Sequence, residues 1–416
     1  MPESPSAPIT SLYIHVPFCA QKCEYCAFYS EASSGELINR YVAALVRELE
    51  IVAGDLKPKT IFFGGGTPSI LNLRQWETIL RAMEKLNLLD ARAVGTAGGS
   101  SRAAPQRGPA EFEFTVESNP ATVSADKAKL LRDFGVTRVS MGVQSLDERL
   151  LERLGRIHSR AMAFKSFDIL RRAGFDNLNL DLMFAIPTQT MDIWRDTLNE
   201  AMAMQSEHLS SYEVIYEDDT PLFEQLKAGE FSVDENLACE MYEELLSTAT
   251  TAGFRQYEIA NLARDPGTVS PQPAARSPQQ IPACACQHNV NYWRGGGFYG
   301  LGPSATGYVR GVRTKNWSNT QLYCEQLEKN RRAIESSEEL SPLRRAGEIA
   351  AFGLRMNVGW EFDEFLRATG FDLRREWNSE MQQLAGRGRA EIIGDHFRLT
   401  HQGLRFADSA AEMFLR

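Results

Sequence analysis

The sequence lacks long hydrophobic runs, and it is poor in cysteine. None of its apolar stretches reaches the roughly 18 residues that a transmembrane helix needs. Residues 1–10 contain neither the basic segment nor the apolar segment of a secretory signal. Seven cysteines in 416 residues are too few and too unevenly placed for the disulfide scaffold of a secreted protein. These absences predict a soluble, cytoplasmic protein without a membrane span.

An excess of positive charge is absent as well. The chain has 45 Lys and Arg against 54 Asp and Glu, a formal net charge of −9 at pH 7. Such a chain has no general attraction for nucleic acid or an anionic membrane, so we predict no nucleic-acid partner and leave only peripheral membrane association open. The hydrophobic fraction of 43% and the charged fraction of 24% are those of an ordinary globular protein. At roughly 150 residues per domain, the length predicts two or three domains.

Three of the seven cysteines lie within eight residues of one another. Cys19, Cys23 and Cys26 form the pattern C-x3-C-x2-C, which in a reducing compartment is typical of a zinc or iron–sulfur site because thiolates are soft ligands. A structural zinc ion needs four protein ligands, and no second C-x2-C or H-x3-H pattern stands nearby to complete them. A 4Fe-4S cluster held by three thiolates instead keeps one iron free to bind another molecule. The sequence therefore favours a 4Fe-4S cluster with an open iron over a zinc knuckle.

Residues 11–211 alternate short apolar, β-branched runs with longer amphipathic stretches, which is the pattern of βα units. Six such units predict an α/β fold with a partial (β/α)6 TIM-like barrel, in which functional residues gather at the carboxyl ends of the strands. The expected strands are 12–16, 60–63, 113–116, 138–142, 177–183 and 210–215, and the expected helices are 37–53, 73–86, 124–134, 160–173 and 191–203.

Two segments rich in Gly, Pro, Ser and Ala interrupt this pattern at residues 94–110 and 265–282, and we interpret both as flexible surface insertions. After a linker near residues 335–341, three helical stretches precede a hairpin that turns at Gly394-Asp395, which is the order of a winged-helix domain. The eleven basic and eleven acidic residues of this last part argue against DNA binding and favour a packing or lid role. The expected parts are an N-terminal tail (1–10), a barrel core (11–235), a segment that completes the barrel (236–333) and a helical, winged-helix-like C-terminal domain (341–416).

Glycine and polar residues follow several of the expected strands. The run from Gly64 to Pro68 (GGGTP) follows the second strand, where residues without side chains let backbone amides approach a ligand closely. Glu117, Gln144 and Asp181 stand at or near the ends of the next three strands. Each of them alone is more often a satisfied polar residue at a strand end. Together they place acceptors and an amide over one pocket, as the ribose hydroxyls and ammonium of a nucleoside ligand require.

The first strand leads directly into the cysteine group as YIHVPFC, and an aromatic residue, Tyr25, precedes the last cysteine. This combination resembles the radical S-adenosylmethionine (SAM) superfamily, in which three cysteines hold a 4Fe-4S cluster and SAM chelates the fourth iron. More closely, the sequence resembles the oxygen-independent coproporphyrinogen III oxidase family and, within it, the branch of haem chaperones called HemW. The motifs YIHVPFC, GGGTPS, VESNP, SMGVQS with a following LGR, and LDLMFAIP carry this resemblance, which covers nearly the whole chain apart from the two insertions.

The resemblance implies a ligand set residue by residue. It implies that Arg156 faces the carboxylate of SAM and that the glycine run binds its amino group. Ile215 and Ala305 are further candidates to line the pocket, and we assign no catalytic residue. The implied cluster ligands are Cys19, Cys23 and Cys26, and the implied SAM-binding residues are Tyr13, Tyr25, Gly65, Gly66, Thr67, Glu117, Gln144, Arg156 and Asp181.

A later segment, Cys286 to Trp293 (CQHNVNYW), contains H-N-x-x-Y-W, which resembles a motif that the chaperone branch associates with haem. His288 is a candidate iron ligand and Cys286 an alternative thiolate, while Tyr292 and Trp293 offer flat aromatic surfaces for a macrocycle. The alternative is that these aromatic residues belong to the hydrophobic core and have no role in binding.

Two features distinguish the sequence from the oxidases of this family. The oxidases carry a further cysteine two places after the last cluster ligand, where this sequence has Phe28, and they have a longer N-terminal extension. The resemblance therefore favours a haem chaperone that binds a 4Fe-4S cluster, SAM and haem as cargo and transfers haem to an acceptor, expected to be a respiratory haem protein. The alternatives are an oxygen-independent coproporphyrinogen III oxidase that uses a 5′-deoxyadenosyl radical in porphyrin biosynthesis, and a radical SAM enzyme with another substrate.

Overall fold

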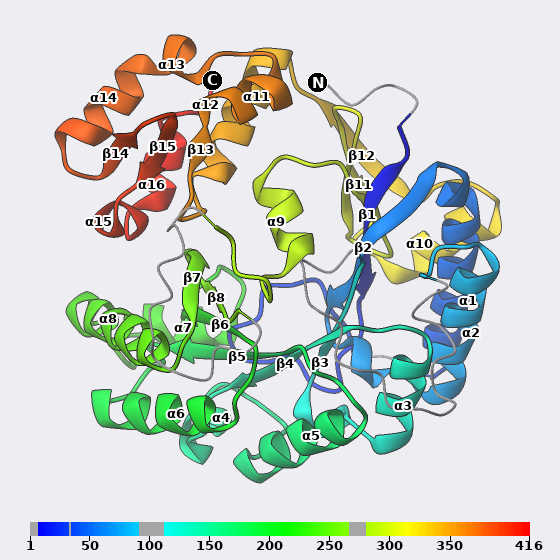
Figure 1. The fold of residues 1–416 in the computed structure, drawn as a ribbon. Helices are drawn as coiled ribbons and strands as arrows, with labels where there is room; N and C mark the ends of the chain where they lie inside the picture. The colour runs from blue at the N-terminus through cyan, green and yellow to red at the C-terminus, as the bar shows by residue number, and fades with distance from the viewer. Residues whose placement is uncertain (1–6, 33–34, 91–111, 266–279) are drawn as a thin grey trace.

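The computed structural model describes residues 7–32, 35–90, 112–265 and 280–416. Figure 1 shows a curved sheet with helices along its outer side and a separate group of helices that contains the C-terminus. The first six strands are β1 (Ile9–Val16), β2 (Leu56–Gly65), β3 (Glu113–Ser118), β4 (Arg138–Gln144), β5 (Leu178–Phe184) and β6 (His208–Glu213). The helices between and after them are α1 (Gly35–Val52), α2 (Leu73–Lys85), α3 (Ala125–Asp133), α4 (Glu148–Arg153), α5 (Arg160–Arg172), α6 (Met191–Ala203), α7 (Pro221–Lys227) and α8 (Glu235–Thr251).

The main sheet is an open, partial barrel, as the sequence predicts. Its nine strands have the order β7-β8-β6-β5-β4-β3-β2-β1-β9, and neighbours from β1 to β6 pair in parallel. The added strands are β7 (Arg255–Glu258), β8 (Asn261–Ala263) and β9 (Tyr299–Leu301). Strand β9 extends the parallel sheet beside β1, whereas β8 pairs antiparallel with β6.

The two faces of the sheet have different chemistry. On one face, side chains such as Leu12, Ile14 and Phe63 are fully buried and belong to the same apolar core as residues of α1 and α2. The alternate positions of the same strands carry Tyr13 and His15, which face the inside of the barrel. The inside of this barrel is thus lined with polar and aromatic groups, which is the composition of a binding cavity rather than of a packed core.

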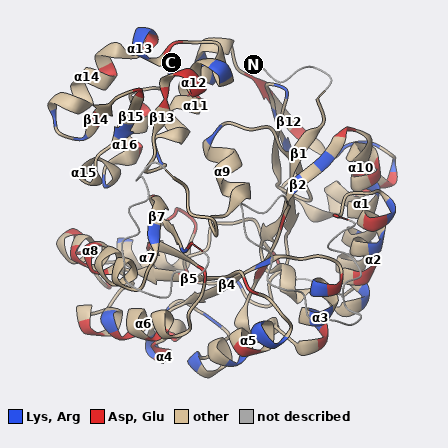
Figure 2. Cartoon of the chain, in the orientation of Figure 1, with Lys and Arg blue, Asp and Glu red and all other residues tan. Residues whose placement is uncertain are grey.

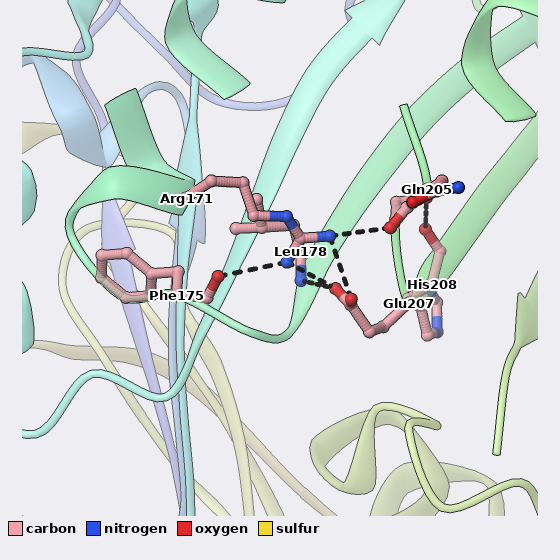
Figure 3. A network of polar contacts seen from close by, with 7 residues as sticks. Arg171, Phe175, Leu178, Gln205, Glu207 and His208 are labelled. Atoms are coloured by element: carbon pink, nitrogen blue, oxygen red, sulfur yellow. Dashed lines mark hydrogen bonds and ion pairs between the residues drawn. The ribbon is translucent and has the colours of Figure 1, made fainter. Parts of the chain in front are cut away.

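A polar network at the surface fixes the starts of β5 and β6 (Figure 3). The guanidinium of Arg171 on α5 makes two hydrogen bonds of 2.9 Å to the carboxylate of Glu207, and it also donates to Gln205 O (2.8 Å) and to Phe175 O (3.1 Å). Leu178 N donates to the same carboxylate at 3.0 Å. One carboxylate therefore sets the relative positions of a helix and two strands.

The elements after the barrel core include a second, three-stranded sheet with the order β10-β11-β12. Its strands are β10 (Thr306–Val309), β11 (Val312–Asn316) and β12 (Ile334–Glu339), and the accompanying helices are α9 (Gln287–Trp293) and α10 (Thr320–Glu328). The expected linker near 335–341 is therefore largely a strand: exposed polar residues of β12 pair antiparallel with β11 along its length. The expected insertion at 94–110 lies outside the described residues, as does most of the one at 265–282.

The C-terminal residues form helices and a hairpin around an apolar core of their own. Trp360, Trp377 and Phe397 are among its fully buried side chains. The hairpin turns at Gly394-Asp395, as the sequence predicts, and its two strands are joined by a third. The elements are α11 (Pro342–Gly353), β13 (Trp360–Glu361), α12 (Phe362–Thr369), α13 (Leu373–Glu376), α14 (Asn378–Gly386), β14 (Ala390–Ile393), β15 (His396–Leu399), α15 (His401–Leu404) and α16 (Ala407–Glu412).

All six expected strands and five expected helices are present, with differences at their ends. Strand β1 begins at Ile9, three residues earlier than expected, and β6 ends at Glu213, two residues earlier than expected. Helices α4, α7 and α8 were not expected at all. Within the described ranges, no helix combines the length and the hydrophobicity that crossing a bilayer requires.

Candidate functional site

The cysteine group lies on a loop that follows the carboxyl end of β1. Backbone hydrogen bonds close this loop, since Cys19 N donates to Glu31 O (3.2 Å) and Glu31 N donates to Pro17 O (2.8 Å). A third bond, from Glu24 N to Leu154 O (3.1 Å), ties the loop to the end of α4. The loop therefore holds three free, partly exposed thiols, at Cys19, Cys23 and Cys26.

An arginine and a threonine contact two of these thiols. Arg156 Nη1 donates to Cys23 Sγ at 3.3 Å, and Thr67 Oγ1 lies 3.5 Å from Cys19 Sγ. Burial raises the pKa of the Cys26 thiol, and the nearby thiols of Cys23 and Cys19 act in the same direction. Three neighbouring thiolates repel one another, so a bound cationic iron–sulfur core would stabilise all of them at once.

The three thiols do not surround a single point. Across the described residues, no three His, Cys, Asp or Glu side chains come close enough together to hold one metal ion. In a 4Fe-4S cluster each thiolate binds a different iron, so the sulfurs need not converge on one point. The 4Fe-4S cluster and the zinc knuckle both stay predictions from the sequence.

The glycine run after β2 packs directly against the cysteine loop. Gly66 N donates to Val16 O at 2.8 Å. A Cβ atom at Gly66 would lie only 2.7 Å from Phe18 O, and a Cβ atom at Gly65 would lie 2.5 Å from the His15 ring. Gly65 also has a φ of 105°, which side chains of L-residues rarely tolerate. Only glycine fits at these two positions, and the run leaves its backbone close to the cysteines.

Two acidic side chains face the inside of the barrel beside the glycine run. Burial, aided by the nearby Asp181, raises the pKa of Glu117 to about 8. Burial also raises the pKa of Asp181, while Arg138 and hydrogen bonds from Asn179 Nδ2 (2.6 Å) and Ser140 Oγ (3.3 Å) lower it. Two carboxyl groups that repel each other in a partly buried site attract a cationic or hydroxyl-rich ligand.

Backbone geometry directs further polar groups towards the same place. Gln144, the last residue of β4, has a φ of 66°, and this left-handed conformation costs a non-glycine residue roughly 1–2 kcal/mol. The register between β4 and β5 shifts between Gly142 and Gln144, which turns the side chain out of the regular pleat. Arg156 Nη2 donates to Gly142 O at 2.6 Å, and the arginine also bonds the Tyr25 side chain. The structure thus holds Gln144, Arg156 and Tyr25 together beside the cysteine loop.

The structure places the predicted cluster and SAM residues in one region, along the inside of the barrel and at the carboxyl ends of β1 to β5. All twelve of them are partly exposed, and none is buried or fully exposed. This is the accessibility that ligand-binding residues need. Of the two further candidates, Ile215 is 65% exposed beyond the end of β6, whereas Ala305 is 2% exposed in the connection between β9 and β10.

Three other residues of this region have no role in the sequence-based predictions. His15 bonds Tyr13 Oη through Nδ1 (3.0 Å) and Tyr29 O through Nε2 (2.9 Å), which links the strand to the cysteine loop. Arg138 is a buried cation near Asp181. Tyr212 bonds Ser210 and lies near the same acid, and the residue is 42% exposed. The signal that could have identified them is the two-residue alternation of the strands, which puts His15 on the face of Tyr13.

The segment that resembles the haem motif forms α9 and lies at the opposite, amino-terminal end of the strands. Glu113, the first residue of β3, accepts hydrogen bonds from Gln287 N (2.9 Å) and His288 N (3.1 Å), and Cys286 Sγ lies 3.5 Å from the same carboxylate. Cys286 is fully buried, and burial together with Glu113 raises the pKa of its thiol to about 12. Helix α9 therefore closes the end of the barrel that lies away from the cysteines.

The side chain of His288 is 1% exposed, and both of its ring nitrogens are engaged. Nδ1 lies 2.9 Å from Thr60 Oγ1, and Nε2 lies 2.7 Å from Tyr292 Oη. The ring also stacks on Phe62 with a centroid distance of 5.2 Å. Burial lowers the pKa of His288 to about 3, so the imidazole is neutral at physiological pH. In this structure both ring nitrogens are occupied by hydrogen bonds, so an iron bond from His288 stays a prediction and would require one of these hydrogen bonds to break.

The aromatic residues of α9 pack against other parts of the chain. The Tyr292 ring lies 4.4 Å from that of Phe298, and the Trp293 ring lies 6.4 Å from that of Phe352 on α11. The guanidinium of Arg355 covers the Trp293 ring at 5.0 Å. These contacts favour the core interpretation of Tyr292 and place Trp293 between the barrel and the C-terminal helices.

Comparison with known proteins assigns residues 13–201 to the radical SAM superfamily. Among curated proteins, the haem chaperone HemW of Bacillus subtilis (strain 168) is 31% identical, with 97% of this chain and 99% of that protein covered. The haem chaperone HemW of Escherichia coli (strain K12) is also 31% identical, with 98% of each chain covered. A mitochondrial protein of Danio rerio, radical S-adenosyl methionine domain-containing protein 1, is 30% identical over 96% of this chain and 85% of its own length.

Among solved structures, coproporphyrinogen III oxidase (HemN) from Escherichia coli has a TM-score of 0.78 and covers 99% of this chain and 91% of its own. Its sequence identity is only 18%, so this similarity shows the fold alone. It shows that the partial barrel and the C-terminal helical part together form a known arrangement.

Proposed function

The chain belongs to the family of the haem chaperone HemW within the radical SAM superfamily, and from this premise we propose that it is itself a haem chaperone. In this proposal it holds a 4Fe-4S cluster through Cys19, Cys23 and Cys26, binds SAM at the open iron, and carries haem to an acceptor protein. The acceptor that we expect is a respiratory haem protein in the same compartment, which we take to be the cytoplasm.

The observation that carries the proposal is the meeting of the cysteine loop with the glycine run. Thr67 at the end of that run lies 3.5 Å from Cys19 Sγ, and Arg156 lies 3.3 Å from Cys23 Sγ. Three segments far apart in the sequence thus bring both thiols and a cation to one place. A cofactor that bridges a cluster iron and a nucleoside pocket needs both.

The chain's own residues have separable roles in this proposal. The carboxylate of Glu117 would bind the ammonium of SAM, and Asp181 and Gln144 would hold the ribose hydroxyls. The guanidinium of Arg156 would pair with the SAM carboxylate. A reduced 4Fe-4S cluster supplies a single electron to a bound ligand. We propose that in this chain the cluster and SAM regulate haem transfer. The chain has Phe28 where the oxidases that it resembles have a cysteine.

The test is a haem titration of anaerobically reconstituted protein, followed by Soret absorbance. We expect saturation near one haem per chain and, in a second step, haem transfer to apomyoglobin that changes when the cluster is absent. Cys19→Ala, Cys23→Ala and Cys26→Ala should each lose iron and sulfide, while Cys239→Ala, which alters an exposed cysteine on α8, should keep both. Decarboxylation of coproporphyrinogen III with matching formation of 5′-deoxyadenosine would instead establish the oxidase alternative.

A further inference from the structure

Most of the net negative charge of the chain comes from one short segment. Residues 213–235 contain eight acidic residues and one lysine, a formal charge of −7 compared with −9 for all 416 residues. All eight acidic side chains are exposed, and we call them the acidic surface. Its members are Glu213, Glu217, Asp218, Asp219, Glu224, Glu230, Asp234 and Glu235.

The two ends of this segment come together in space. The Tyr216 ring, from the loop after β6, lies 5.5 Å from the ring of Phe231, in the loop before α8. The two ends of the acidic surface therefore lie close together beside α7 and α8, and Figure 2 shows acidic residues in red on α8. Glu213 and Glu235 lie close enough to repel each other, and burial followed by this repulsion raises the pKa of Glu213.

The acidic surface adjoins the cysteine loop. Leu222 N, at the start of α7, donates to Glu24 O at 3.0 Å. Tyr25 packs in the same apolar cluster as Leu222 and Val214. A molecule that docks on the acidic surface would therefore lie beside the open end of the barrel, where the cluster and SAM are proposed to bind.

Few groups of the chain neutralise these charges. In the described part of the chain, Glu224 is the one member with an ion-pair partner, Lys227 at 3.0 Å, and Asp234 caps α8 by accepting from Leu237 N. Apolar side chains stand among the acids, with Ile215 65% exposed and Val233 42% exposed. Unpaired charge of one sign around exposed apolar groups is the composition of a docking surface.

We propose that the acidic surface docks a partner protein through a basic face with an apolar centre. The inference rests on the proposed function in one respect, since the partner would be the protein that accepts haem. An anionic membrane or a nucleic acid would be repelled by a patch of this charge. A metal ion is also disfavoured, because among residues that the structure describes no three carboxylates converge on one point.

The experiment uses the full chain and a defined probe, a fluorescein-labelled amphipathic peptide of Lys and Leu of roughly 14 residues, followed by fluorescence anisotropy. The test variant is Glu217→Gln/Asp218→Asn/Asp219→Asn. The control variant, Asp126→Asn/Glu335→Gln/Glu339→Gln, removes three exposed carboxylates elsewhere on the protein. We expect the test variant to bind the peptide about tenfold more weakly at about 0.05 M salt, and the control to stay within about twofold of wild type.

The apolar part of the proposal has its own test. Val233→Ser should weaken binding of the Lys/Leu peptide several-fold and leave binding of a Lys/Gly peptide of equal charge unchanged. Equal binding by the test and control variants would overturn the proposal, because the peptide would then respond to net charge alone. Haem titration of the same variants separates the two ideas. If haem binding is unchanged but the test and control variants bind the peptide equally, only the docking surface is refuted. If the wild type shows no saturable haem binding, only the chaperone function is refuted.

Discussion

Replacement of His288 by alanine tests whether α9 is a haem-binding element or a structural closure of the barrel. In the structure, the imidazole bonds Thr60 and Tyr292 and stacks on Phe62, with both nitrogens engaged. Since Thr60 Oγ1 donates to Ser11 Oγ, Nδ1–H donates to Thr60 and Nε2 accepts from Tyr292. A residue held in this way stabilises the folded protein before any ligand is present.

The size of the effect follows from these contacts. Each of the two hydrogen bonds contributes about 1 kcal/mol to the free energy of unfolding. Removal of a buried ring leaves a cavity that costs about 2 kcal/mol more. We therefore expect His288→Ala to lower the free energy of unfolding by about 3–4 kcal/mol, which for a chain of 416 residues lowers Tm by about 3–5 °C. The loss should be constant above about pH 7.5 and should shrink as the pH falls below about 6.5, because burial lowers the pKa of folded His288 to about 3 whereas the unfolded chain takes up a proton near the ordinary histidine pKa of about 6.5.

The assay is thermal and urea unfolding of haem-free, cluster-free protein, with haem titration of the folded fraction measured separately. The matched control is His401→Ala, since that side chain is 58% exposed and lies 3.6 Å from Glu243, and it should change the free energy of unfolding by less than about 0.5 kcal/mol. If haem-free His288→Ala is as stable as wild type and haem binding is lost, then His288 is an iron ligand and the structural argument is refuted.

Three further predictions concern the site and its support. Affinity for SAM should rise by up to about tenfold from pH 6 to 7, because Glu117, with a pKa of about 8, must lose its proton to bind an ammonium. Equilibrium binding of SAM at several pH values checks this. A pH dependence of equal size in Glu117→Gln would contradict it. Gly66→Ala should lower the cluster content after reconstitution and cost about 1–3 kcal/mol of stability, because its Cβ would lie 2.7 Å from Phe18 O; unchanged iron content would refute this. Glu113→Gln should lower the free energy of unfolding in urea by about 2 kcal/mol, since the carboxylate accepts hydrogen bonds from two amides at the start of α9. The control Glu335→Gln, which alters an exposed residue of β12, should have almost no effect.

The sequence could predict which residues gather at one end of the barrel because they lie in short motifs at strand ends. Parallel strands bring their carboxyl ends to the same edge of a sheet. The meeting of the cysteines, the glycine run and the acids that follow successive strands can therefore be predicted without knowing how side chains pack. The strained backbone of Gln144 could not be foreseen in the same way. Its φ of 66° depends on a shift in register between two strands, which no local pattern reveals.

The elements that the sequence missed depend on contacts between distant residues. The polar sequence of β12 predicts a linker. The segment is a strand because it forms backbone hydrogen bonds with β11. The position of α9 depends on Glu113, which is 175 residues away from His288 in the sequence. An acid at the start of a strand is usually exposed, so its role as a cap for a distant helix could not be read from the strand itself.

The C-terminal part takes part in closing the barrel and is not merely attached to it. Tyr257 on β7 is buried, and its hydroxyl bonds both His208 Nε2 (2.9 Å) and Cys286 N (3.1 Å), which joins the inside of the barrel to the start of α9. The carbonyl of the same Tyr257 accepts from Asn357 N at 3.0 Å, just after α11. One residue thus connects the sheet, the closing helix and the C-terminal helices. The C-terminal helices are therefore held to the sheet by a hydrogen bond to the same residue that holds the start of α9.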